Sequence, residues 1–268
     1  TCLTRNFYEV IRTSKPVLLF LDMEHYGEDI FHTSKSNNEL YRLDYECIEA
    51  AIFFLRKFLI KIERQDLIHP NNPIFNRETE SNIKENSNSS IGRFSAITAT
   101  NATRKKTSCH VVFHNLAFVS GVELHRFMHQ FVLFVTNFEP KDDEERRKKS
   151  ILFYLHEKTQ KATIVIDPLV YHKNETVGQL FRLVYSSKYG NEISLLNPLK
   201  KENLHFASDK LFSADITDFL KSLAQPVISN ERLEKAIRIN PLPLCDNPRL
   251  SSPSLCRERI CGLENPDR

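Results

Sequence analysis

Two apolar stretches of the chain end in acidic residues whose side chains could bind metal ions. Asp22 and Glu24 lie at the end of VLLFLDME, and Asp167 ends TIVID. In an extended strand, residues i and i+2 point to one face, about 7 Å apart, so Asp22 and Glu24 project together. A third carboxylate beside them is costly unless cations neutralise the charge. The pattern therefore predicts a site for divalent cations built from two strands.

A second set of polar residues has the chemistry needed to hold phosphate oxygens. Lys106, Ser108 and His110 alternate along KKTSCHVVF, which puts them on one face of a strand. Arg182 and Lys188 follow in FRLVYSSKYG. Their donor groups suit phosphate, while carboxylate oxygens suit Mg²⁺ or Mn²⁺. Together the two sets indicate phosphoryl transfer assisted by two metal ions.

The order of these motifs resembles the catalytic core of the eukaryotic primase-polymerase (PrimPol) family, in the archaeo-eukaryotic primase superfamily. The resemblance spans roughly residues 8–223. It is carried by YEVI at 8–11, D-x-E at 22–24, K-x-S-x-H at 106–110, an apolar strand ending in Asp167, and FRLVYSSKYG at 181–190. D-x-E and S-x-H are weak motifs singly, but their order and the longer string make the match specific.

The resemblance implies a role for each matching position. The metal-binding and catalytic carboxylates would be Asp22, Glu24 and Asp167. The residues implied to contact the incoming nucleotide are Lys106, Ser108, His110, Arg182, Lys188 and, near the sugar, Tyr8. The implied cofactor is Mn²⁺ or Mg²⁺, and the implied partners are a DNA template and primer, nucleoside triphosphates and single-stranded-DNA-binding proteins.

The implied reaction is transfer of a nucleotide to a template-paired 3′-hydroxyl or to an initiating nucleotide. The resemblance also implies a role in repriming and DNA damage tolerance, in the nucleus or the mitochondrion. It does not say whether primer initiation survives, or which sugar is preferred. An alternative of another class stays open, namely a degenerate relative that binds nucleic acid or nucleotides without catalysis.

The expected fold is α+β, a primase-like core with an RRM-like mixed or antiparallel sheet flanked by helices. Hydrophobic periodicity agrees, because strands and helices alternate irregularly. The expected strands are 15–22, 108–119, 151–155, 163–167, 181–185 and 192–195, and the expected helices are 45–64, 122–134 and 216–223. We expect the core over 1–225, a mobile polar insertion over about 69–105, and a poorly ordered extension over 226–268.

The chain departs from the family pattern in three respects. The module that precedes YEVI in the family has no counterpart in the sequence, and the link HKNETVGQL at 172–180 is poorer in arginine. No Cys/His set has the spacing of a zinc finger, so zinc is not predicted. We therefore expect an incomplete catalytic core.

Composition is that of an ordinary globular protein. Of 268 residues, 41% are hydrophobic and 26% charged, and the net charge of +3 gives only a mild attraction to nucleic acid. The six cysteines are scattered, which does not indicate a disulfide scaffold. No apolar run approaches the roughly 20 residues that span a bilayer, so no membrane partner is expected.

Two other patterns have simpler interpretations. His125 and His129 have the i, i+4 spacing of a zinc-binding pair, but HRFMH lacks the glutamate that acts as base in zinc hydrolases. We interpret them as ordinary helix histidines. The basic quartet at 146–149 follows four acidic residues, and we interpret it as a solvated helix face rather than a DNA-binding patch.

Overall fold

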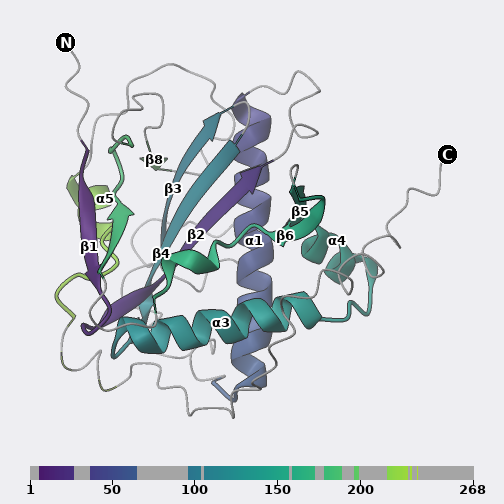
Figure 1. Cartoon of the computed structure of the whole chain (residues 1–268), viewed down its shortest axis with the longest axis horizontal. Helices are drawn as coiled ribbons and strands as arrows, with labels where there is room; N and C mark the ends of the chain where they lie inside the picture. Colours follow the sequence, from purple (N-terminus) through teal and green to yellow (C-terminus); the bar gives the residue numbers. More distant parts are fainter. Residues whose placement is uncertain are drawn as a thin grey trace, which may run out of the picture.

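In the computed structural model, the largest sheet among the described residues has four strands. Strand β2 (Val17–Tyr26) pairs with β4 (Lys106–Phe118), β4 pairs with β3 (Ala96–Thr103), and β3 pairs with β8 (Asn197–Pro198), all antiparallel. Figure 1 shows β2, β4 and β3 side by side. The structure describes residues 6–26, 37–64, 96–103, 106–156, 159–172, 178–188, 196–198, 216–228, 230 and 234.

Strand β2 is buried along most of its length because its sequence is apolar on both faces. Each residue from Val17 to Leu21 is at most 1% exposed. Beyond Leu21, buried and half-buried residues alternate along the strand: Met23 is buried, and its neighbours Asp22 and Glu24 are half-buried. The strand therefore leaves the core at its two carboxylates.

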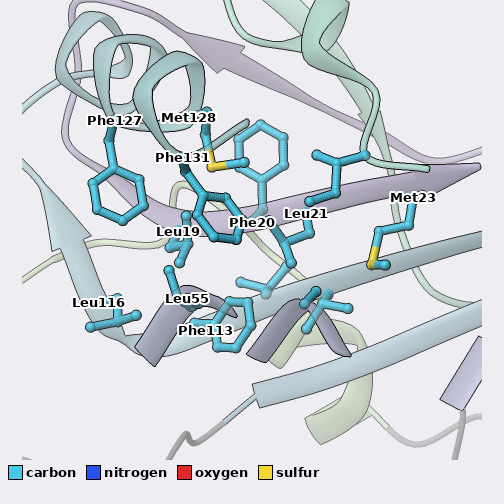
Figure 2. Close-up of a cluster of buried hydrophobic side chains, with 14 of the residues drawn as sticks. Leu19, Phe20, Leu21, Met23, Leu55, Phe113, Leu116, Phe127, Met128 and Phe131 are labelled. Atoms are coloured by element: carbon cyan, nitrogen blue, oxygen red, sulfur yellow. The ribbon is translucent and has the colours of Figure 1, made fainter. Parts of the chain in front are cut away.

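Two long helices close the core. Helix α1 (Asn37–Lys61) and helix α3 (Gly121–Asn137) run across each other beside the sheet (Figure 1). Their buried residues recur every three or four positions, which is the period of an amphipathic helix. Figure 2 shows Phe127 and Phe131 of α3 in one cluster with Leu19 of β2. The core thus joins both helices to the strand that carries Asp22 and Glu24.

The start of α3 is fixed against the turn between the first two strands. Ser120 caps the helix, and its hydroxyl accepts the N–H of Glu123 at 3.2 Å. The N–H of Gly121 donates to the carbonyl of Thr13 at 2.8 Å, and a Cβ on Gly121 would lie only 2.8 Å from Thr13 Cα. Only glycine allows this approach.

Smaller elements surround the sheet. Strands β1 (Tyr8–Arg12) and β7 (Gly178–Arg182) form an antiparallel ribbon. Strands β5 (Phe153–His156) and β6 (Lys161–Ile164) form an antiparallel hairpin. Further helices named within the described ranges are α4 (Asp143–Ile151), the 3₁₀ helix η2 (Pro168–Val170) and α5 (Ile216–Lys221). In Figure 1, β1 and α5 lie at one side of the sheet, and β5, β6 and α4 lie at the other.

These pairings confirm an α+β fold with antiparallel sheets and helices. The expectation of a mobile polar insertion over about 69–105 is wrong for residues 96–103, because these eight residues form strand β3. The small and β-branched residues of AITATNAT pair with β4 along the whole strand, from Ala96 opposite Phe113 to Thr103 opposite Lys106. Residues 69–95, the expected strand 192–195 and the chain beyond 234 lie outside the described residues.

Candidate active site

Three carboxylate-bearing residues lie on two adjoining segments of backbone. The N–H of Glu24 donates to the carbonyl of Val165 at 2.7 Å, and the N–H of Asp167 donates to the carbonyl of Asp22 at 2.9 Å. An isolated antiparallel bridge joins the same two segments between these bonds. Residues 165–167 therefore run along the edge of β2, and the structure brings Asp167 directly beside Asp22.

Asp167 is positioned by the 3₁₀ turn that follows it. Its Oδ1 accepts the N–H of Leu169 at 2.8 Å. Pro168 occupies the first position of η2, where its fixed φ and missing N–H cost nothing. Ile166, just before Asp167, is fully buried. The chain thus leaves the core at Asp167, as it does at Asp22.

Ser108 and His110 lie opposite the carboxylates on the neighbouring strand. In the register of β2 and β4, Asp22 faces His110 and Glu24 faces Ser108. The Nε2 of His110 is 3.5 Å from Oδ1 of Asp22. The Nδ1 of His110 is 3.1 Å from the carbonyl of Arg182. Because a carbonyl only accepts, Nδ1 carries a hydrogen, and Nε2 is the nitrogen that faces Asp22.

The ribbon of β1 and β7 adds Tyr8 and Arg182 to the same place. Tyr8 is the partner of Arg182 in the register of the two strands. Burial lowers the pKa of the Arg182 guanidinium, and the nearby Tyr8, Asp22 and Glu24 act in the opposite sense. Arginine nevertheless stays charged in proteins. The site therefore contains a half-buried cation beside its carboxylates.

The two lysines are less closely tied to the site. Lys106 is the first residue of β4, opposite Tyr26, and its backbone alone is described. Lys188 has an exposed side chain. It follows a turn at Tyr185, whose φ of 61° is in the left-handed region. Contact of either lysine with a phosphate stays a prediction.

Tyr171 is a residue of this region that the sequence analysis missed. It is 5% exposed, and its hydroxyl donates to the carbonyl of Phe20 at 2.9 Å. Burial is the main cause that raises the pKa of the Tyr171 hydroxyl well above its ordinary value. The negative charges of Asp22 and Asp167 raise it further. The hydroxyl therefore stays protonated and keeps its role as a donor. The only sequence signal was its place shortly after Asp167 in IDPLVY.

A row of four aromatic rings runs from Tyr171 to His110. Tyr171 and Phe20 have ring centroids 5.1 Å apart, Phe20 and Phe181 4.8 Å, and Phe181 and His110 4.5 Å. The last pair is stacked. Such contacts add to the area that the rings bury. The row joins β2, β4, β7 and the segment after η2, and it fixes the plane of the His110 imidazole.

The donor chemistry of the site fits Mg²⁺ or Mn²⁺, which bind carboxylate oxygens. Among the residues that the structure describes, no three side chains of His, Cys, Asp or Glu are gathered closely enough to enclose an ion. The backbone nevertheless places Asp22, Glu24 and Asp167 on two adjoining segments.

The histidine pair at 125 and 129 and the basic quartet at 146–149, which we interpreted as ordinary helix surface, include side chains with contacts to other elements. The Nδ1 of His125 is 2.7 Å from the carbonyl of Tyr171, and the rings of His125 and His129 are 6.3 Å apart. The ammonium of Lys149 donates to the carbonyls of Thr136 and Phe138 at the end of α3. Lys149 thus satisfies the end of a helix.

No family model and no curated protein matches this chain. Within the described ranges, no helix has the length and apolar character needed to cross a membrane.

Proposed function

We propose that the chain is the catalytic core of a DNA-directed primase or polymerase, with a primase-like version of the α+β fold. It transfers nucleotides from nucleoside triphosphates to a template-paired 3′-hydroxyl or to an initiating nucleotide. One observation carries the proposal. The hydrogen bond from the N–H of Asp167 to the carbonyl of Asp22 joins two acidic motifs that are far apart in the sequence.

The carboxylates have a clear task in this reaction. Divalent cations held by Asp22, Glu24 and Asp167 would lower the pKa of the attacking hydroxyl and stabilise the leaving pyrophosphate. The burial of β2 beneath Asp22 and Glu24 keeps the strand fixed, so that their side chains need only rotate. The backbone that carries the carboxylates is therefore fixed by the core, and only their side chains would have to move to bind an ion.

The groups opposite the carboxylates are suited to the triphosphate. The Nε2 of His110 faces the site because Nδ1 is occupied by the carbonyl of Arg182. A protonated His110 would donate from Nε2 to a phosphate oxygen, and the Arg182 guanidinium would add a second charged donor. Ser108, opposite Glu24, supplies a hydroxyl. Tyr8, opposite Arg182, is proposed to contact the sugar.

A nucleotide-incorporation assay tests the proposal. Purified protein, a primed DNA template, labelled deoxynucleotide and Mn²⁺ should give extended primer. Asp22→Ala combined with Glu24→Ala should reduce extension on the order of 10²-fold or more, because both substitutions remove ligands that act in the transition state. Asp143→Ala combined with Glu144→Ala is the matched control, since these carboxylates are 96% and 67% exposed on α4.

The outcomes separate the proposal from its alternative. Equal extension by the wild type and by the Asp22 and Glu24 double variant would refute the assignment of these residues. Binding of nucleotide by the wild type without any extension would favour a degenerate, non-catalytic relative. A role in repriming and damage tolerance, in the nucleus or the mitochondrion, stays a prediction from the resemblance.

A further inference from the structure

The segment after Asp167 is held at both of its ends. At one end, the N–H of Asp167 donates to Asp22 on β2 at 2.9 Å. At the other end, the hydroxyl of Tyr171 donates to the carbonyl of Phe20 on the same strand at 2.9 Å. Phe20 and Asp22 are two residues apart, so both bonds reach one short part of β2. The turn η2 lies between the two fixed points.

His125 supplies a third point of attachment, from a different element. Its Nδ1 lies 2.7 Å from the carbonyl of Tyr171. Because the acceptor is a carbonyl, Nδ1–H is the donor. His125 lies on α3, whose opposite residues Phe127 and Phe131 are fully buried in the core. The carbonyl of Tyr171 is therefore attached to a helix that cannot move independently of β2.

We propose that His125 and Tyr171 are positioning residues, which fix Asp167 against Asp22. We call this group, consisting of His125, Tyr171 and the carbonyl of Phe20, the Tyr171 anchor. Tyr171 contributes two contacts, a hydroxyl bond to β2 and a carbonyl bond to α3. Loss of either contact allows the end of η2 to shift, and Asp167 shifts with it. The functional part of this inference rests on the proposed metal-dependent reaction.

The physical reason is the precision that a shared ion requires. Carboxylate ligands must be held within about 0.5 Å of their working geometry, and supporting hydrogen bonds provide that precision. Removal of such supporting groups typically costs about 10-fold to 100-fold in metal affinity or activity. The short turn η2 is the only connection between Asp167 and Tyr171 along the chain, so displacement at one end is transmitted to the other.

Three variants and one control separate the hydrogen bonds from general packing. Tyr171→Phe removes the hydroxyl and keeps the ring next to Phe20. His125→Leu removes the donor to the carbonyl of Tyr171, whereas His125→Asn keeps an N–H donor close to the place of Nδ1. His129→Leu is the control, because His129 lies one turn further along α3 and is exposed.

Two measurements are made on each full-length variant. Electron paramagnetic resonance of free Mn²⁺, titrated in the presence of deoxynucleoside triphosphate, gives the metal affinity without turnover. We expect about tenfold weaker Mn²⁺ binding for His125→Leu and Tyr171→Phe, and a change within about twofold for His125→Asn and His129→Leu. Amide hydrogen exchange by NMR, without metal, should be faster at Asp167 and Leu169 in the first two variants only.

Each outcome decides the inference. Unchanged exchange at Asp167 in both His125→Leu and Tyr171→Phe would overturn it, as would equal losses in His125→Asn and His125→Leu. Faster amide exchange throughout the protein in His125→Leu and Tyr171→Phe would show a general loss of stability, and it would also overturn the inference. If the wild type binds no Mn²⁺, the proposed function fails, and exchange at Asp167 alone then decides whether the Tyr171 anchor positions this residue.

Discussion

Glu9 connects the first strand to the segment that follows α5. Its two carboxylate oxygens accept the N–H groups of Ala224 and Gln225, each at 2.7 Å. The side chain of Gln225 in turn bonds to the backbone of Arg12 and Lys15. Burial raises the pKa of Glu9, although its two hydrogen bonds act in the opposite sense. The folded protein therefore binds the Glu9 proton more tightly than the unfolded chain does.

We predict that the stability contributed by Glu9 falls as the pH rises. An acid whose pKa is raised on folding stabilises the folded protein fully at a pH below its ordinary pKa of 4.5. This stabilisation is lost as the pH rises through the pKa of the folded state. Denaturant unfolding of the wild type and of Glu9→Gln at about pH 4 and about pH 7 measures the effect. Between the lower and the higher pH, the unfolding free energy of the wild type should fall relative to that of Glu9→Gln. A constant difference, or a shift in favour of the wild type, would contradict this.

At the scale of whole elements, a partly buried ion pair helps to join α4 to α1. The ammonium of Lys57 on α1 lies 2.8 Å from a carboxylate oxygen of Glu145 on α4. Glu145 also accepts the N–H of Lys141 at 2.7 Å. The hydrogen bond from Lys57 is the largest cause that lowers the pKa of Glu145, and the bond from Lys141 adds to it.

We predict that Lys57→Met destabilises the protein at neutral pH and that this deficit disappears in acid. An acid with a lowered pKa contributes stability above its ordinary value, 4.5, and loses it as the pH falls through the folded pKa. Thermal unfolding between about pH 3 and pH 7 measures the deficit. Lys148→Met is the control, because Lys148 also lies over the Phe53 ring but pairs with the exposed Glu144. If the stability deficits of Lys57→Met and Lys148→Met depend on pH to the same extent, the Lys57–Glu145 ion pair does not cause the effect.

The contact between α3 and the first turn gives a second prediction about elements. Gly121→Ala should destabilise the protein by about 1–3 kcal/mol, because its Cβ meets the backbone of Thr13 and cannot be accommodated by side-chain movement. Gly178→Ala is the matched control. Its Cβ would lie 3.1 Å from a methyl group of Val10, which is 54% exposed and can rotate away. Urea unfolding should rank Gly121→Ala as the more damaging change, and the reverse order would contradict this.

For the molecule as a whole, periodicity predicted the elements that have strong apolar patterns. Strand β2, helix α3 and the hairpin of β5 and β6 all form close to their expected positions. Strand β3 was missed because Ala, Thr and Asn give it no apolar face, and pairing with β4 selects its conformation instead. Such pairing depends on residues far along the chain, which local patterns do not contain.

The candidate site was predictable to a similar extent. Alternation along a strand predicted that Asp22 and Glu24 project together. The apolar run before Asp167 predicted buried residues up to that carboxylate, but strand β6 itself ends earlier, at Ile164. The hydrogen bond that joins Asp167 to Asp22 depends on the fold. Tyr171 and His125 were not predictable as neighbours of the site, because both act through backbone carbonyl groups, which have no signature in the sequence.

The proposed two-metal site is tested by a crystal structure of the protein with Mn²⁺ and a non-hydrolysable deoxynucleoside triphosphate. We expect Asp22, Glu24 and Asp167 to share bound Mn²⁺, and the triphosphate to lie against His110 and Arg182. Nucleotide or metal bound elsewhere on the protein, with the three carboxylates sharing no ion, would contradict it.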